Sequence, residues 1–112
     1  MKITKQENYW ILEDEKDNVK AFASYLENKA YAEFENKNVV IDILKYGSLS
    51  LEELLSFLEL SNKHRAQNHS FVIANDTINI DQVPEELIVV PTLLEAGDVI
   101  QMEEIERDLG AF

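Results

Sequence analysis

The sequence contains no cysteine and little glycine, proline or positive charge. Without cysteine, disulfides, zinc thiolate sites and thiol nucleophiles are excluded. Only three glycines and two prolines interrupt the 112 residues, which argues against a low-complexity or disordered chain. No charged segment followed by an apolar one comes after Met1, and no apolar run approaches a membrane span in length. We therefore expect a soluble cytoplasmic protein that does not insert into a membrane.

Basic residues are scarce. Ten lysines and arginines oppose 22 acidic residues, which gives a net charge of -12 at pH 7. Such a surface repels nucleic-acid phosphates and anionic lipid head groups, so we expect no direct nucleic-acid partner. The nearest approach to a basic patch, Lys63, His64 and Arg65, is interpreted as a solvated helix end whose cations complement the helix dipole. Self-repulsion favours solubility, and we expect a monomer or a weak homodimer.

Apolar residues are plentiful, at 46% of the chain. A chain of this length holds one core, so residues 1–112 are predicted to form a single domain. Three apolar runs are typical of strands buried on both faces: residues 39–43, 71–74 and 87–90. Two shorter strands are predicted near the beginning, at residues 2–6 and 9–13, with a tight turn between them.

Helical periodicity separates these runs. The spacing predicts one helix from Val19 to about Asn28, a second from Ser50 to about Ala66, and a third from Thr92 to Leu109. The conformation of residues 29–37 is left open. Buried strands alternating with helices indicate an α/β fold, a mixed four- to five-stranded sheet with helices packed mainly on one side.

The turn that opens the second helix carries hydroxyl groups. Ser50 and Glu53 fit a capping box, in which each side chain bonds the other residue's backbone amide. The functional alternative is phosphorylation of Ser48 or Ser50, because a phosphate at a helix N-terminus is held by free amides and the dipole. Glu52 and Glu53 oppose that phosphate. The candidate switch or interaction residues are Tyr46, Ser48, Ser50, Glu52 and Glu53.

No catalytic constellation is recognisable. The two histidines, His64 and His69, are five residues apart across a helix end, a spacing that does not place them on one face. We expect no metal, no cofactor and no enzymatic activity. Residues 75–86 resemble a calcium loop but have Asn75 where Asp is needed and Ile80 where Gly is needed, so a solvated turn is predicted. Asp42, inside an apolar strand, is interpreted as orienting the turn that follows.

The last helix combines acidic and apolar side chains. Its candidate interaction residues are Glu103, Glu104 and Glu106, alongside Val99, Met102, Ile105 and Leu109. Acid on one side and apolar residues on another form a candidate surface for a basic or amphipathic partner. The alternative is a helix that only covers the sheet.

Three segments carry a family resemblance. Residues 38–42 form a strand that ends in Asp42, residues 71–75 form the next buried strand, and residues 88–96 form a strand followed by a Thr-x-x-Glu-Ala helix start. In their order and residue pattern these segments resemble the STAS domain, the fold of bacterial anti-sigma-factor antagonists, over about residues 9–100. The resemblance implies a non-enzymatic protein that acts by binding another protein.

STAS proteins that act as phosphoswitches open the second helix with Asp-Ser-x-Gly, whose serine is phosphorylated by a partner kinase. Counted without gaps from Asp42, that segment falls on residues 50–53, so Leu51 replaces the phosphoserine and Glu53 replaces the glycine. The resemblance therefore implies a regulatory or adaptor protein without an intact phosphoserine switch. Ser48 or Ser50 as a substitute stays open.

The ending, residues 102–110, also resembles a group of short STAS-like proteins from Bacteroidetes-type bacteria, some of which carry the label ribonuclease Z. That label implies a metallo-β-lactamase fold with a His-x-His-x-Asp-His motif, and this chain has no such motif. Two alternatives to partner binding remain: RNA processing or another hydrolase function, and binding of a small ligand at the strand ends.

Overall fold

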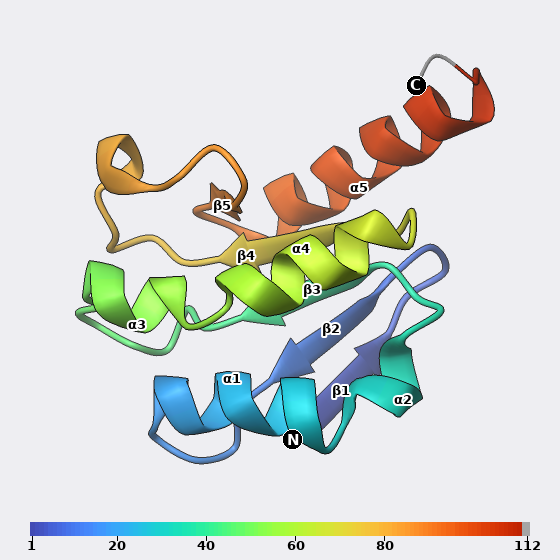
Figure 1. The fold of residues 1–112 in the computed structure, drawn as a ribbon. Coiled ribbons are helices and arrows are strands. Elements are labelled where there is room, and N and C mark those ends of the chain that lie inside the picture. Colours follow the sequence, from blue (N-terminus) through green and yellow to red (C-terminus); the bar gives the residue numbers. More distant parts are fainter. Residues whose placement is uncertain (111–112) are drawn as a thin grey trace.

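Five short strands form one mixed sheet in the computed structural model, which describes residues 1–110 (Figure 1). The strands are β1 (Lys2–Lys5), β2 (Trp10–Glu13), β3 (Val39–Asp42), β4 (Phe71–Ala74) and β5 (Ile88–Val90). Their order in the sheet is the order in the chain. β1 is antiparallel to β2, whereas β2 to β5 are parallel. The predicted α/β fold with a mixed sheet is thus confirmed, with five strands.

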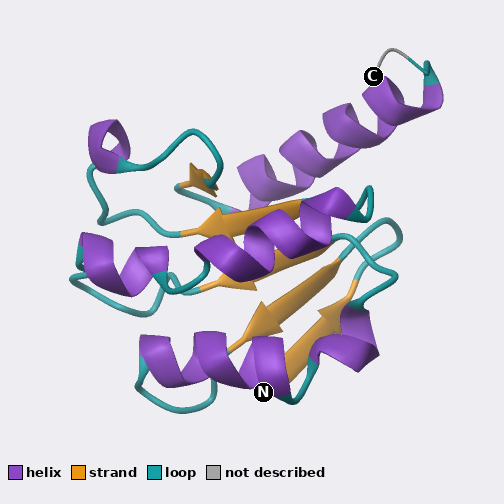
Figure 2. Ribbon diagram, viewed as in Figure 1, coloured by secondary structure: helices purple, strands orange, loops and turns teal. Residues whose placement is uncertain are grey.

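The helices are α1 (Val19–Asn28), α2 (Tyr31–Phe34), α3 (Leu51–Leu55), α4 (Leu58–Ala66) and α5 (Leu93–Asp108), with a short 3-10 helix η1 (Ile80–Gln82) (Figure 2). The undecided segment 29–37 therefore contains one helical turn, α2. α5 ends as predicted before Gly110, which has a positive φ of 63°. None of these helices, within the part of the chain that the structure describes, is long and apolar enough to cross a membrane.

The helices form two unequal layers. α1 to α4 cover one face of the sheet, and α5 alone covers the other (Figure 1). Successive strand residues alternate between these faces. The first face receives Leu12, Val39, Ile41, Ile43, Phe71, Ile73 and Val89, and the second receives Ile11, Val40, Val72, Ala74, Ile88 and Val90. Both faces of the central strands are therefore dry, and helices lie mainly on one side as expected.

The predicted helix at residues 50–66 is wrong in one respect, because it is two helices. The chain turns at Ser56 and Phe57, where the Phe57 amide bonds the Leu54 carbonyl at 3.1 Å in a 3-10 pattern. The turn buries Phe57 completely, edge-on to the ring of Phe22 with 6.4 Å between ring centroids. A straight helix would forfeit this contact between α1 and the α3–α4 junction.

A glycine fixes how closely α5 approaches the sheet. A Cβ at Gly97 would lie 2.7 Å from the hydroxyl oxygen of Tyr9, which comes just before β2. The bare backbone lets the Tyr9 ring pack directly under the helix. Ala96, the neighbouring residue on this side, is also small and fully buried.

We expect Phe57→Ala to lower the free energy of unfolding by about 3–5 kcal/mol, because it removes a fully buried ring and leaves a cavity. Urea denaturation measures the loss. Leu55→Ala is the control: Leu55 lies two residues earlier but is 37% exposed, and its loss should cost clearly less. Equal losses in the two variants would show that the α3–α4 junction does not depend on Phe57.

Candidate functional site

The loops that follow β2 and β3 are tied together at the carboxyl edge of the sheet. Lys45 Nζ donates to the backbone carbonyls of Asp14 at 2.6 Å and Lys16 at 2.7 Å. The Tyr46 hydroxyl donates to the Asp14 carboxylate and lies 3.1 Å from the Lys16 carbonyl oxygen. Burial, and then this hydrogen bond, raise the pKa of Tyr46 well above its ordinary value. Tyr46 therefore stays protonated and holds the turn in place.

The serine turn has the capping geometry that the sequence predicts. Ser50 Oγ accepts from the Glu53 amide at 3.1 Å, and the Glu53 carboxylate accepts from the Ser50 amide at 3.0 Å. Glu52 is exposed and pairs with Lys20 of α1 at 2.6 Å. Ser48 is exposed. Both candidate phosphoacceptors are exposed, but the Ser50 hydroxyl oxygen is already used by the helix as a cap.

Two polar side chains organise the turns after β3 and β4. Asp42 Oδ1 accepts from the Leu44 amide at 3.1 Å, which agrees with its predicted role in orienting the turn. Asn75 donates to the Ile43 carbonyl at 3.1 Å, and its oxygen accepts from the Thr77 and Ile78 amides. Because Asn75 is buried, the prediction of a solvated turn is wrong at this residue. Within residues 1–110, no group of three His, Asp or Glu side chains is placed to hold a metal ion.

His64 is the largest departure from the sequence prediction. It is fully buried, so the interpretation of residues 63–65 as a solvated helix end is wrong there. Its Nε2 lies 2.6 Å from the Lys37 carbonyl oxygen and its Nδ1 lies 3.0 Å from the Tyr31 hydroxyl. A carbonyl only accepts, so Nε2 carries the proton and Nδ1 accepts from Tyr31. The neutral ring thus links α2, the start of β3 and α4.

The two histidines, expected on different faces, lie side by side with 5.4 Å between ring centroids. Asn68, with φ of 64°, turns the chain back after α4 and brings His69 to the His64 ring. Burial lowers the pKa of His64 to about 4, partly offset by the Lys37 carbonyl. Burial, and then the positive charge of Arg107, lower the pKa of His69. Both rings therefore favour the neutral form in the folded protein.

Arg65 changes the interpretation of the acidic helix. Its guanidinium bonds Glu103 of α5 at 3.1 Å and the Phe71 carbonyl at 2.8 Å. Glu103 is therefore turned inward, and Glu104 is only half-exposed. Of the three predicted acidic interaction residues, Glu106 alone is exposed, so the prediction is wrong for Glu103 as a free surface group. Arg65, too, is not part of a solvated helix end.

The side of α5 that faces away from the sheet carries four large apolar side chains. We call it the outer stripe; it consists of Leu94, Met102, Ile105 and Leu109, which are 78%, 62%, 52% and 75% exposed. Exposed acids accompany it: Glu95, Asp98, Glu106 and Asp108. The buried residues Ala96 and Ile100 lie on the opposite side of the helix. α5 thus has large apolar side chains on two sides and covers the sheet with only one of them.

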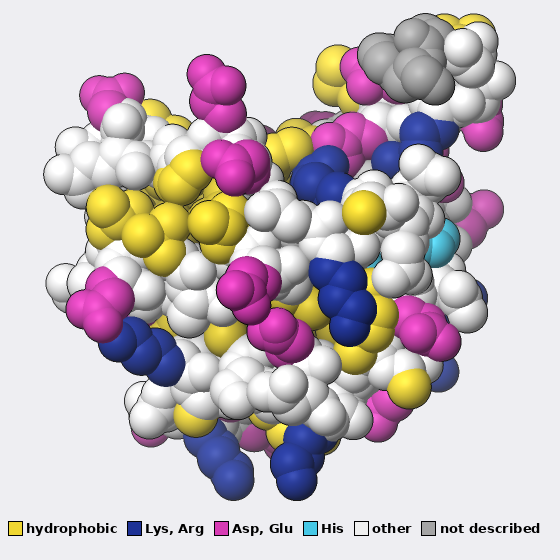
Figure 3. Space-filling view, in the orientation of Figure 1, with side chains coloured by type: hydrophobic (Ala, Val, Ile, Leu, Met, Phe, Trp, Pro, Cys, Tyr) yellow, Lys and Arg dark blue, Asp and Glu magenta, His cyan; other side chains and the backbone are white. Residues whose placement is uncertain are grey.

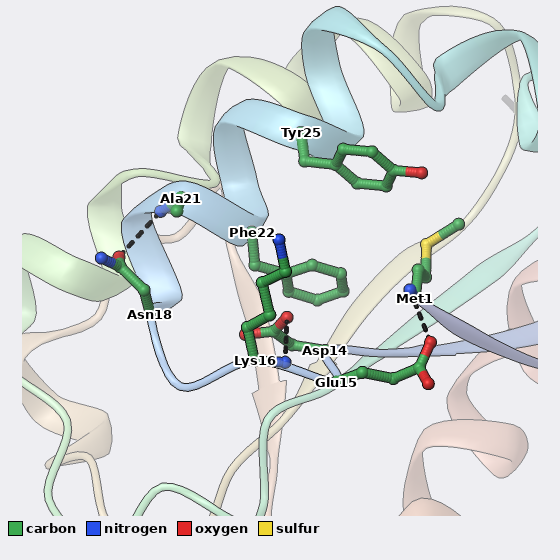
Figure 4. A pocket seen from close by; sticks show the side chains of 8 residues that line it. All are labelled: Met1, Asp14, Glu15, Lys16, Asn18, Ala21, Phe22 and Tyr25. Carbon is green, nitrogen blue, oxygen red and sulfur yellow. Dashed lines mark hydrogen bonds and ion pairs between the residues drawn. The ribbon is translucent and has the colours of Figure 1, made fainter.

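The surface offers other features besides this stripe. Acidic side chains are scattered over the face in Figure 3, and apolar side chains gather on it between the η1 loop and α3. Ile80, in η1, is 58% exposed. A hollow of about 630 Å³ lies beside α1, lined by Asn18 and Phe22 among others (Figure 4). Its polar groups serve the local turns, since Asn18 caps α1 and Asp14 bonds the Lys16 amide.

A second hollow of about 380 Å³ lies at the opposite edge, where β2, β3 and β4 begin. We call it the amino-edge hollow; it brings together Asn8, Trp10, Asn38, Asn68, His69 and Arg107. These residues come from four parts of the chain and share no motif. Sequence reasoning missed them, and the only signal was Arg107, the one basic residue of an acidic helix.

The capping box predicts different effects for the two serines. Ser50→Ala should lower the free energy of unfolding by about 1 kcal/mol, because it removes the acceptor for the Glu53 amide. Ser48→Ala should change it by less than about 0.5 kcal/mol, since an exposed side chain away from such features contributes little. Thermal denaturation of both variants tests this. An equal loss from Ser48 would contradict the cap as the role of Ser50.

Burial of neutral His64 predicts destabilisation by mild acid. The pKa is about 4 in the fold against an ordinary 6.5, so protons favour the unfolded chain. The contribution is complete above about pH 6.5 and is lost as the pH falls toward 4, by roughly 2–3 kcal/mol. Urea denaturation from pH 7 to 4 measures the loss, and His64→Gln should reduce its steepness. A folded-state imidazole that titrates near its ordinary pKa would contradict the prediction.

Comparison with known proteins identifies no relative of the chain. No protein-family model and no curated protein matches the chain. The STAS resemblance therefore stays a prediction. The geometry itself offers two surfaces of interest, the outer stripe of α5 and the amino-edge hollow.

Proposed function

We propose that the chain is a non-enzymatic, STAS-like regulatory or adaptor protein that binds a protein partner along the outer stripe of α5. The observation that carries the proposal is the exposure of the four large apolar side chains of that stripe. Met102, Ile105 and Leu109 follow one another at spacings of three and four residues, which aligns them on one side of the helix. Leu94 lies on the same side nearer the helix start, separated from Met102 by the exposed Asp98.

The stripe has the size of a helix-binding surface. From Leu94 to Leu109 it extends for about 22 Å, at 1.5 Å per residue. An amphipathic helix of about four turns covers that length with residues at i, i+3, i+4 and i+7. Exposed apolar rows with polar borders are typical of protein interaction sites.

Charge selects among possible partners. The stripe is accompanied by Glu95, Asp98, Glu106 and Asp108, and the whole chain carries a net charge of -12. A second copy would bring the same acids against each other, at a cost in repulsion. A segment with apolar anchors and flanking lysines or arginines would instead meet complementary charge. The partner class that fits best is therefore a basic amphipathic helix.

The serine turn supports a constitutive and not a phosphorylated mode of binding. Ser50 caps α3 and Leu51 stands where phosphoswitch members of the STAS family have their serine. Partner binding at α5 needs neither residue. The proposal thus keeps the family's mode of action, binding another protein, and moves it to another surface.

A pull-down from native cell extract with the tagged full chain, read by mass spectrometry, identifies the partner and any phosphosite. Calorimetry with the purified partner then measures affinity. We expect Ile105→Glu to weaken binding at least tenfold, because it places a charge at the centre of the apolar row. High salt should weaken binding further, since the flanking contacts are ionic.

Ile80→Glu is the matched control. It makes the same substitution at a similarly exposed isoleucine, 58% against 52%, in η1 and so outside α5. Both variants should keep the wild-type melting temperature within a few degrees. Loss of the partner in Ile80→Glu with full binding by Ile105→Glu would place the interaction at η1 and overturn the proposal for α5.

A further inference from the structure

Arg107 lies in an unusual environment for so acidic a protein. It is half-buried on α5, and its guanidinium donates to Ser70 Oγ at 3.1 Å and Asn38 Oδ1 at 3.4 Å. Both acceptors are neutral. No ion pair joins Arg107 to a carboxylate anywhere in residues 1–110. The other arginine, Arg65, shows the contrast, because it is paired with Glu103.

The guanidinium borders the amino-edge hollow and has donors to spare. Both of its hydrogen bonds leave from one nitrogen, Nη2, whereas an arginine has five N–H groups in a planar fork. The frame around it is rigid: Asn38 also accepts from the Ser70 amide at 2.8 Å and donates to the Asn8 carbonyl at 3.1 Å. The donor fork is therefore held in position before any ligand arrives.

A second cation lies at this hollow besides Arg107. Lys37 lines it, and the ammonium groups of Lys5 and Lys37 lie 4.7 Å and 5.6 Å from the centre of the Trp10 ring. His69 lines it too, and the charge of Arg107 contributes to lowering its pKa. An anion beside Arg107 would relieve this repulsion and favour the charged imidazole.

Acidic groups are present at the same hollow and limit what it accepts. Glu7 and Glu104 both line it. Their charge disfavours a large, highly charged polyanion such as a nucleic-acid strand. The volume, about 380 Å³, is that of a small-molecule site and is too small for a helix.

We propose that the amino-edge hollow binds a small molecule through an oxyanion group, a carboxylate or a phosphate, that accepts hydrogen bonds from the Arg107 guanidinium. The planar fork matches the two oxygens of either group. The amide side chains of Asn8 and Asn68 at the lining supply neutral hydrogen-bonding groups for the rest of the ligand. This site is independent of the outer stripe, which lies on the other side of α5.

The test is a nitrogen-15 NMR titration of the full chain with sodium phosphate and, separately, sodium acetate, at ionic strength held constant with sodium chloride. We expect at least one probe to give saturable shifts centred on the amides of Asn38, His69 and Arg107. Phosphate alone or acetate alone would identify the group that the site prefers. Arg107→Gln should weaken the response at least tenfold, and Arg107→Lys should weaken it less, because the charge remains.

Lys63→Gln is the control, since it also removes one positive charge but at an exposed lysine of α4 that lies over the Tyr31 ring, outside the hollow. It should leave the titration unchanged. If Arg107→Gln does not fold, Lys37→Gln takes its place as the test variant. It removes the other positive charge that lines the hollow and should also weaken the response. Equal responses of wild type and the hollow variants, the same shifts with chloride alone, or no saturable shift with either probe would overturn the proposal.

Discussion

Burial of both faces of the central strands is the constraint on which the rest of the structure depends. Every residue of β3 and β4 is buried, so each face of the sheet needs a helix layer. Four helices share one face, and α5 must cover the other by itself. It does so through small residues that bring it close to the sheet. With no further layer behind it in the described chain, its far side is left in contact with solvent.

Much of this arrangement could be predicted from local patterns. The β-branched run at residues 39–43 and the leucine spacing after Ser50 are strong signals, because strand and helix periods place apolar residues on the faces that must be covered. The break at Phe57 could not be predicted, since neither glycine nor proline marks it. Its cause is a contact with Phe22, which is distant in the sequence.

The chemistry at single positions was harder to predict. His64 sits between Lys63 and Arg65, so its neighbours suggested a charged helix end, whereas its partners are Tyr31 and the Lys37 carbonyl. Both are about 30 residues away. The serine turn stood out because its residues are adjacent and fit a known template. The amino-edge hollow could not be recognised in the sequence, because its asparagines and its arginine come from separate segments that only the folded sheet brings together.

The close approach of Gly97 to Tyr9 connects the packing of α5 to the amino-edge hollow, because Tyr9 lines that hollow. Arg107 lies ten residues after Gly97 in the same helix, which places the two residues about 15 Å apart along the helix axis. A tilt of α5 by only a few degrees about Gly97 would move the guanidinium of Arg107 by about 1 Å, which is enough to break a hydrogen bond of ordinary length. A methyl group at residue 97 would meet the Tyr9 hydroxyl, and because Tyr9 lines the hollow it would reach the site without touching the charged groups there.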